Sequence, residues 1–126
     1  MAERSISFIK WQAAADVDIV AGEARLRYIT DVPGQQAVYL VKLEQARAFL
    51  AGAAPQPYIE AEALARGISP SGVAQMVIDT AQMWNDVKGP AIEAARIKAK
   101  LAIEAAADHA AVRLACDAGI DELRTL

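Results

Sequence analysis

The sequence predicts an all-α protein: a small helical bundle built on an antiparallel helix hairpin plus a long, proline-interrupted helix, with a short extended N-terminal arm. Alanine, the strongest helix former, supplies 29 of the 126 residues. Hydrophobic residues make up 55% of the chain, too many for a disordered segment, and a chain of this length can bury one core. Apolar residues recur at helical spacing over most of the sequence. We therefore expect an N-terminal arm at residues 1–11 and a single helical domain at residues 12–126.

The first eleven residues differ in pattern from the rest of the chain. Ile6, Phe8 and Lys10 alternate with Ser5, Ser7 and Ile9, and this period of two ends at Trp11. Such alternation predicts a strand or an extended arm. Ile6, Phe8 and Trp11 are candidates for a partner interface, as an added strand or an aromatic anchor. The alternative is that the arm folds back over the end of the bundle.

Residues 12–30 and 35–50 are predicted to be helices that pack as an antiparallel hairpin. Pro33 and Gly34 end the first helix and leave a link short enough for antiparallel packing. Apolar residues off the main stripe of the first helix make its apolar face wide or two-sided. The main stripes hold Val17, Val20, Ala21, Ala24 and Tyr28 in the first helix and Tyr39, Leu43, Ala46 and Leu50 in the second, whereas Ile19, Leu26 and Ile29 lie off the first stripe.

A short helix at 58–66 and then a long helical segment are predicted next. Ser69 followed by Pro70 is a strong helix start, because the hydroxyl caps free backbone N–H groups and proline suits the first helical position. Gly89 and Pro90 interrupt the long segment. We expect either a kink or two helices that meet there.

Beyond the interruption, the helical pattern is lined with alanine. Ile92, Ala95, Ala99 and Ala102 form one stripe, which is a candidate oligomer seam because alanine lets helix backbones approach closely. Packing against helices of the same chain is an equal alternative. The last predicted helix occupies residues 108–123, with the aspartate at its start as the cap.

The sequence carries no enzyme signature, and we predict no catalytic residues, no cofactor site and no metal site. His109 and Cys116 are the only histidine and cysteine. On one helix they would lie roughly 10 Å apart, too far for a thiolate–imidazole pair. A zinc site would require more ligands of these types. The two residues are interpreted as a surface histidine and a small buried hydrophobe.

Charge and hydropathy exclude two classes of partner. The net charge is −3, which argues against a dedicated nucleic-acid binder. Acidic residues also dilute the basic clusters at residues 25–27 and 96–100. No uncharged apolar run approaches the roughly 20 residues of a membrane span. We expect no nucleic-acid partner and no membrane partner.

Three stretches of the chain resemble small alanine-rich helical proteins encoded among the tail-fibre and baseplate genes of tailed bacteriophages and prophages. Together they cover roughly residues 12–107. The stretches are Ala24-Arg25-Leu26-Arg27-Tyr28-Ile29-Thr30 with Pro33-Gly34-Gln35 and residues 39–50; Pro57-Tyr58-Ile59-Glu60-Ala61-Glu62-Ala63 with the Ser69-Pro70 helix start; and Trp84 with Ile92-Glu93-Ala94-Ala95-Arg96-Ile97-Lys98-Ala99-Lys100.

The resemblance implies a non-enzymatic structural or adaptor component of a phage tail that docks on a fibre or baseplate protein. Its location would then be the virion, with the host cytoplasm during assembly. A homotrimer would match the usual symmetry of fibres. A tail-fibre assembly chaperone that is absent from the mature virion is the alternative, and a small helical regulator of the host is a third hypothesis.

Overall fold

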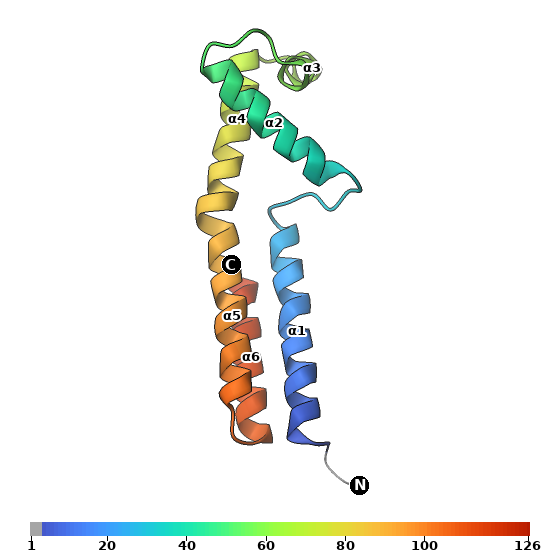
Figure 1. The fold of residues 1–126 in the computed structure, drawn as a ribbon, viewed down its shortest axis with the longest axis vertical. Helices are drawn as coiled ribbons and strands as arrows, with labels where there is room; N and C mark the ends of the chain where they lie inside the picture. The colour runs from blue at the N-terminus through green and yellow to red at the C-terminus, as the bar shows by residue number, and fades with distance from the viewer. Residues whose placement is uncertain (1–3) are drawn as a thin grey trace. The chain divides into compact units, whose positions relative to one another are not determined.

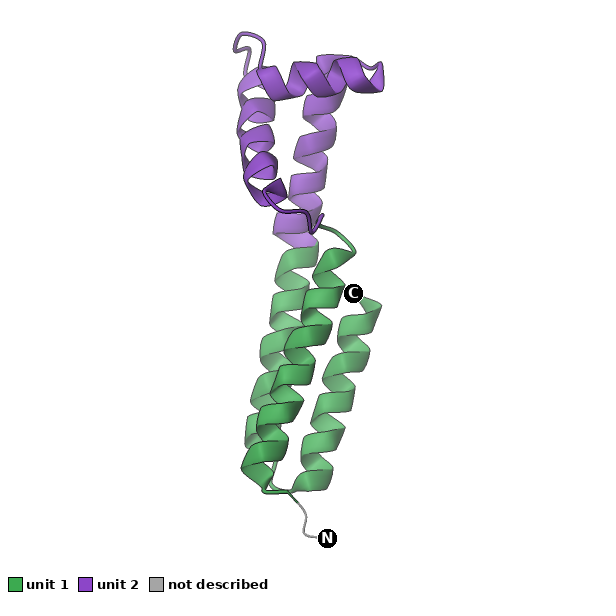
Figure 2. Cartoon of the chain, turned by 90° about the vertical axis from the view of Figure 1, so that its right-hand side faces the viewer, with its two compact units in different colours: residues 1–29, 88–126 green, residues 30–87 purple. Residues whose placement is uncertain are grey.

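The computed structural model describes residues 4–126, which are helical almost throughout and include no strand (Figure 1). The all-α prediction is confirmed. The described residues form two compact units (Figure 2): unit 1 takes in the chain up to Ile29 and from Lys88 onward, and unit 2 is Thr30–Val87. The elements are α1 (Ile6–Leu26), α2 (Gln35–Leu50), α3 (Pro57–Arg66), α4 (Pro70–Gln82), the π-helical segment η1 (Met83–Lys88), α5 (Gly89–Ala105) and α6 (His109–Thr125).

Unit 1 is a bundle in which α1, α5 and α6 all pack against one another. Its interior consists of small and aliphatic side chains, so the helices approach closely. At the closest point a Cβ atom placed on Gly119 would lie 2.4 Å from the Cβ of Ala99. The interior residues are Ala13, Val17, Val20, Ala21 and Ala24 of α1, Ile92, Ala95, Ala99 and Ile103 of α5, and Val112, Cys116, Gly119 and Leu123 of α6.

Unit 2 packs α2, α3 and α4 around a second apolar core. The short helix α3 contributes Ile59, which is fully buried. Tyr39, Phe49 and Ile78 are partly buried and pack against the core. The core residues are Leu43, Ala46, Ile59, Ala63, Val73, Ala74, Val77 and Ala81.

The helix starts predicted at residues 69–70 and 108 are confirmed by their caps. The Ser69 hydroxyl accepts a hydrogen bond from the Gly72 amide at 3.0 Å, and Pro70 is the first residue of α4. The Asp108 carboxylate accepts one from the Ala111 amide at 2.8 Å. Each side chain satisfies a backbone N–H that has no partner within its helix. The bounds of α2 also agree with the predicted 35–50.

The predicted pairing of residues 12–30 with 35–50 as a hairpin is not what stabilises the units. α1 packs on α5 and α6 in unit 1, and α2 packs on α3 and α4 in unit 2. The buried face of α1 is made of alanine and valine and packs within unit 1, whereas Leu43 of α2 packs with Ile59 and Val73 within unit 2. The division of residues 12–126 into two units falls at 29/30 and 87/88.

The prediction of an extended arm is wrong for the described residues, because from Ile6 onward they are helical. α1 begins at Ile6, and the Ser5 hydroxyl accepts a hydrogen bond from the Phe8 amide at 3.2 Å as its N-cap. The buried stripe at Val17 and Ala13 continues back to Ile6 at helical spacing, and a longer helix therefore buries more apolar surface than an arm would. Residues 1–3 of the predicted arm lie outside the described residues.

The Gly89–Pro90 interruption takes the form of a π-helical segment between two α-helices. Proline has no amide hydrogen, and in an α-helix its ring meets the carbonyl group four residues earlier, here that of Asp86. The wider π-helical turn over residues 83–88 relieves this conflict. The backbone is helical on both sides of Pro90.

Candidate protein-binding surface

Helix α1 carries a second apolar face in addition to the face in the core. Its residues, which we call the outer stripe, recur at helical spacings of three and four. At about 100° per residue, the centre of the outer stripe lies about 180° around the helix from the buried stripe. The outer stripe is made of Phe8, Trp11, Ala15, Ile19, Gly22 and Leu26.

The large side chains of the outer stripe are substantially exposed. Trp11 is 68% exposed, Ile19 60%, Leu26 51% and Phe8 39%. Apolar surface left in water forgoes roughly 25 cal/mol per Å² of burial free energy. A continuous row of this kind, rather than scattered single residues, is typical of a surface that binds another protein.

The aromatic end of the outer stripe is already organised. The rings of Phe8 and Trp11 lie 5.9 Å apart between centroids and are tilted by 42°. The Arg4 guanidinium carbon lies 4.8 Å from the Phe8 centroid, at cation–π distance. The predicted interface residues Phe8 and Trp11 therefore share one outward face, whereas Ile6 is half-buried and lies on the side of α1 that faces the core.

The predicted seam on α5 is mostly interior. Ile92 is fully buried, and Ala95 and Ala99 are nearly so, within unit 1 of the same chain. These three residues therefore pack against helices of the same chain, which was the alternative to an oligomer seam. Ala102 is exposed, and Ile103 takes the next inward position instead. The four residues therefore form no common outward surface.

Beside the outer stripe, ion pairs tie α1 to α5. Arg96 and Lys100 donate to the Asp18 carboxylate at 3.0 and 2.9 Å. Arg25 and Arg96 both donate to Glu93, at distances of 2.7 to 3.0 Å. The hydrogen bond from Lys100, with that from Arg96, lowers the pKa of Asp18, and the hydrogen bond from Arg96 lowers the pKa of Glu93. The basic residues noted in the sequence thus neutralise acids of their own unit.

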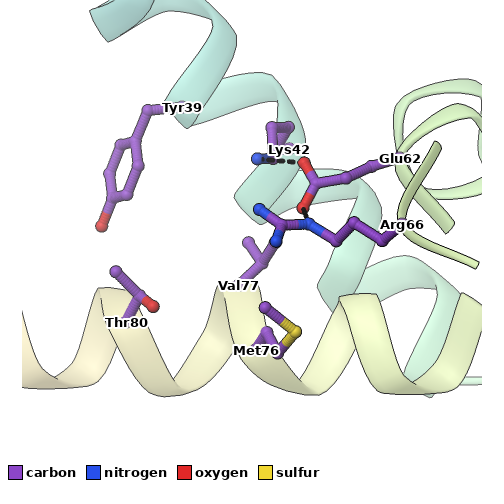
Figure 3. Close-up of a pocket in the computed structure, with 7 residues that line it drawn as sticks. All are labelled: Tyr39, Lys42, Glu62, Arg66, Met76, Val77 and Thr80. Carbon is purple, nitrogen blue, oxygen red and sulfur yellow. Dashed lines mark hydrogen bonds and ion pairs between the residues drawn. The ribbon is translucent and has the colours of Figure 1, made fainter. Parts of the chain in front are cut away.

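A pocket of about 210 Å³ lies in unit 2 between α2, α3 and α4 (Figure 3). Met76 and Val77 of α4 form its apolar side. On the opposite side, Glu62 accepts from Lys42 at 2.5 Å and from Arg66 at 2.9 Å. These bonds, that of Lys42 above all, lower the pKa of Glu62.

The charged residues of this pocket form a structural contact between α2 and α3. An ionised carboxylate held between two cations does not donate a proton near neutral pH. The Tyr39 ring lines the same pocket, and its buried hydroxyl lies near the Asn85 side chain. Burial raises the pKa of Tyr39 and keeps this hydroxyl protonated. The arrangement joins α2 to α3 and offers no acid–base pair.

His109 and Cys116 have separate surroundings, although both lie on α6. The His109 Nε2 atom is 2.6 Å from the carbonyl oxygen of Arg4. Cys116 is buried, and its thiol lies 3.8 Å from the carbonyl oxygen of Ala13. Burial, with Asp16 second, raises the pKa of Cys116. A thiol with a raised pKa is a poor nucleophile.

Residues 4–126 hold no group of three or more His, Cys, Asp and Glu side chains placed to bind a metal ion. Within the same residues, no helix has both the length and the apolar character to cross a membrane. Comparisons of the chain with protein-family models, with curated proteins and with solved structures found no match.

Proposed function

We propose that this chain is a non-enzymatic structural or adaptor component of a bacteriophage tail that acts by protein–protein docking near the fibre or baseplate. The proposal depends on one observation: both compact units turn large apolar side chains outward. Unit 1 does so along the outer stripe. In unit 2, Leu64 of α3 is 85% exposed and Leu40 of α2 is 55% exposed. A chain with apolar surface on two units suits an adaptor, which must bind two neighbours.

The assignment to a phage tail derives from the resemblance carried by residues 24–50, 57–70 and 84–100. In this proposal the partner is a tail-fibre or baseplate protein. The chain is made in the host cytoplasm and then resides in the virion. Its mechanism is shape: rigid alanine-rich helices hold apolar side chains at fixed positions, which lowers the entropic cost of docking.

The state of the reactive side chains supports a non-enzymatic role. Glu62 is ionised and bound to two cations, and the Cys116 thiol is buried with a raised pKa. The His109 Nε2 atom is in hydrogen-bonding contact with the backbone carbonyl oxygen of Arg4. Each of these groups has a partner that stabilises the fold, and none is poised beside another for proton transfer or nucleophilic attack.

A tail-fibre assembly chaperone is the second candidate, and the same exposed apolar surface favours it. A chaperone would bind the fibre chain transiently and leave, whereas a virion component would bury its apolar faces permanently. A small host regulator ranks below both. The pocket in unit 2, of about 210 Å³, is smaller than the roughly 300 Å³ at which ligand pockets begin, and a hollow of about 320 Å³ beside Cys116 in unit 1 is wide open to solvent.

Quantitative mass spectrometry of purified particles tests the proposal. The particles come from the phage or induced prophage that carries this gene. A virion component is expected at a fixed ratio to the fibre protein. Abundance in the lysate with absence from the particles would instead identify the chaperone, and absence of any link to particles would refute both tail assignments.

A matched pair of variants in α3 tests docking through unit 2. Leu64→Ser removes the most exposed large apolar side chain among the described residues and touches no core position. We expect its incorporation into particles to fall. Ala65→Ser places the same serine one residue further along, at an exposed position, and should leave incorporation unchanged. Equal incorporation of the two variants would argue against docking through α3.

A further inference from the structure

We infer that the outer stripe of α1 binds the outer stripe of a second copy of this chain, with the two helices antiparallel. The inference deepens the proposed function and rests on it in one respect, since it names the occupant of one of the two apolar faces. Unit 2 then remains available for the tail partner. The evidence is the order of side-chain sizes along the stripe, the apolar area, and the polar residues beside it.

The order of sizes in the outer stripe is self-complementary when the stripe is reversed. In an antiparallel pair centred near residue 17, Phe8 of one copy lies opposite Leu26 of the other. Ala15 lies opposite Ile19, and Trp11, the largest residue, lies within one residue of Gly22. Large residues meet small ones at the middle positions, so the two helices interlock without voids. The space is present, because no heavy atom lies within 4 Å of a Cβ atom placed on Gly22.

A parallel pair would lack this complementarity. In a parallel pair related by a two-fold axis each residue meets its own copy, so Trp11 would meet Trp11 and Gly22 would meet Gly22. Bulky residues would then hold the helices apart at one end and leave a gap at the other. An antiparallel pair is isologous and closes with two copies. The structure of the stripe therefore favours a dimer over the trimer expected from fibre symmetry.

The apolar area supplies most of what a dimer at the small end of the standard size range buries. A buried aromatic side chain contributes ~150–250 Å², so the exposed parts of Phe8 and Trp11 together supply about one such area. The half-exposed Ile19 and Leu26 roughly double it, which gives ~800 Å² over two copies before any flanking atoms are counted. The residues on either side of the stripe bring the total to the ~1,200 Å² at which specific interfaces begin.

One polar flank of the stripe is also complementary to itself. Gln12 and Glu23 are exposed and lie on the same side of the outer stripe. In the antiparallel register Gln12 of one copy faces Glu23 of the other, so the amide can donate to the carboxylate twice per dimer. On the other flank, Asp18 is neutralised by Arg96 and Lys100 of its own chain, which limits repulsion between the two copies.

Sedimentation equilibrium of the purified full-length chain tests the dimer. We expect a monomer–dimer equilibrium that Trp11→Ala weakens by about thirtyfold or more, as for a central aromatic anchor. Gly22→Leu should weaken it by a similar factor, because the new side chain occupies the space that receives Trp11. The double variant Trp11→Ala, Gly22→Trp exchanges large and small positions and should restore dimerisation.

The Gly22→Leu variant distinguishes the proposed antiparallel dimer from non-specific association through apolar surface. It adds apolar surface to the outside of a monomer, where nothing obstructs it. A non-specific apolar patch would therefore associate more strongly in this variant, and such a result would overturn the antiparallel register. Unchanged helicity by circular dichroism serves as the folding control for every variant.

Cross-linking between copies tests the orientation. Equimolar Gln12→Cys and Glu23→Cys chains are mixed and treated with a short bismaleimide, with the unsubstituted chain as the control for Cys116. The antiparallel pair predicts cross-links between position 12 and position 23. Links only between like positions would establish a parallel pair and overturn the inference.

The failures of the two proposals are distinguishable. A chain that stays monomeric at all concentrations, yet occurs in particles at a fixed ratio, refutes the dimer and leaves the tail assignment intact. A dimer with the expected response to Gly22→Leu, from a gene without any link to particles, confirms the inference and refutes the tail assignment.

Discussion

Gly119→Ala is expected to destabilise unit 1 because Gly119 of α6 packs directly against Ala99 of α5. An alanine Cβ at this position would lie 2.4 Å from the Cβ of Ala99. Carbon atoms in normal contact are ~3.5–4.0 Å apart, so the two helices must separate by about 1 Å. Both atoms are fixed to helix backbones, and no side-chain rotation relieves the overlap.

The expected loss of stability follows from two opposing terms. Overpacking of a core costs ~1–3 kcal/mol, whereas replacing glycine by alanine within a helix gains ~0.5–1 kcal/mol. The overlap with Ala99 puts the first term near its upper end. We therefore expect the free energy of unfolding of Gly119→Ala to fall by ~1–2 kcal/mol.

Urea unfolding followed by circular dichroism measures this loss, and a double-mutant cycle assigns its cause. Ala99→Gly alone should cost ~1 kcal/mol through helix propensity. In the double variant Gly119→Ala, Ala99→Gly, the nearest remaining atom to the new Cβ is the Cα of residue 99 at 3.6 Å, an ordinary contact. The cycle should therefore show a favourable coupling energy of ~1–3 kcal/mol. Amide hydrogen exchange in α6 assigns the change to unit 1.

Gly22→Ala is the matched control for this substitution. Gly22 is also in a helix of unit 1, but no atom lies within 4 Å of a Cβ placed there. The same chemical change should stabilise the chain by ~0.5–1 kcal/mol at this position. If Gly119→Ala stabilises the chain as Gly22→Ala does, the close approach of α5 and α6 is wrong.

Two further predictions concern charge and capping. The pKa of Asp18 is lowered in the folded chain, so its contribution to stability is present above the ordinary value of 3.8 and is lost as the pH falls through the folded value. Asp18→Asn should thus reduce the free energy of unfolding by no more than ~1 kcal/mol near neutral pH. Urea titrations should show that this difference vanishes in strong acid. A difference that stays constant with pH would contradict the ion pairs. Ser69→Ala should cost ~0.5–2 kcal/mol because it removes the cap of α4, whereas Ser71→Ala, inside the same helix and exposed, should change the urea midpoint little; equal effects would exclude the cap.

Local signals predicted the helices well. The Ser69 hydroxyl before Pro70 and the Asp108 carboxylate act within one turn of their own helix, so sequence spacing alone identifies them. The predicted start of α1 was wrong for a physical reason. The period of two covers only six residues, whereas Ser5 is a good N-cap and the buried stripe continues from Val17 back to Ala13 and Ile6.

Helix pairing and the partition into units could not be predicted from spacing. A short link between two helices favours a hairpin, but it does not record which distant helix has side chains of matching size. α1 packs on α5 and α6, whose contacting residues come about 70 to 100 positions later in the chain, as with Arg25 and Glu93. Phe8 and Trp11, which the sequence predicts as interface residues, are outward, whereas the exposure of Ile19 and Leu26 depends on which face of α1 the distant helices cover.

The two apolar faces of α1 show why size, rather than apolarity, decides which face is buried. Hydrophobic periodicity alone treats the two stripes alike, since they lie about 180° apart on one helix. The buried stripe is alanine and valine, and Val17 packs beside the point where Ala99 and Gly119 leave no room for an additional methyl group. Trp11 and Phe8 could not enter that interior without forcing α1 away from α5 and α6. The large residues are therefore outward because the bundle has no room for them, and substitution of Trp11 should alter association without loss of the fold.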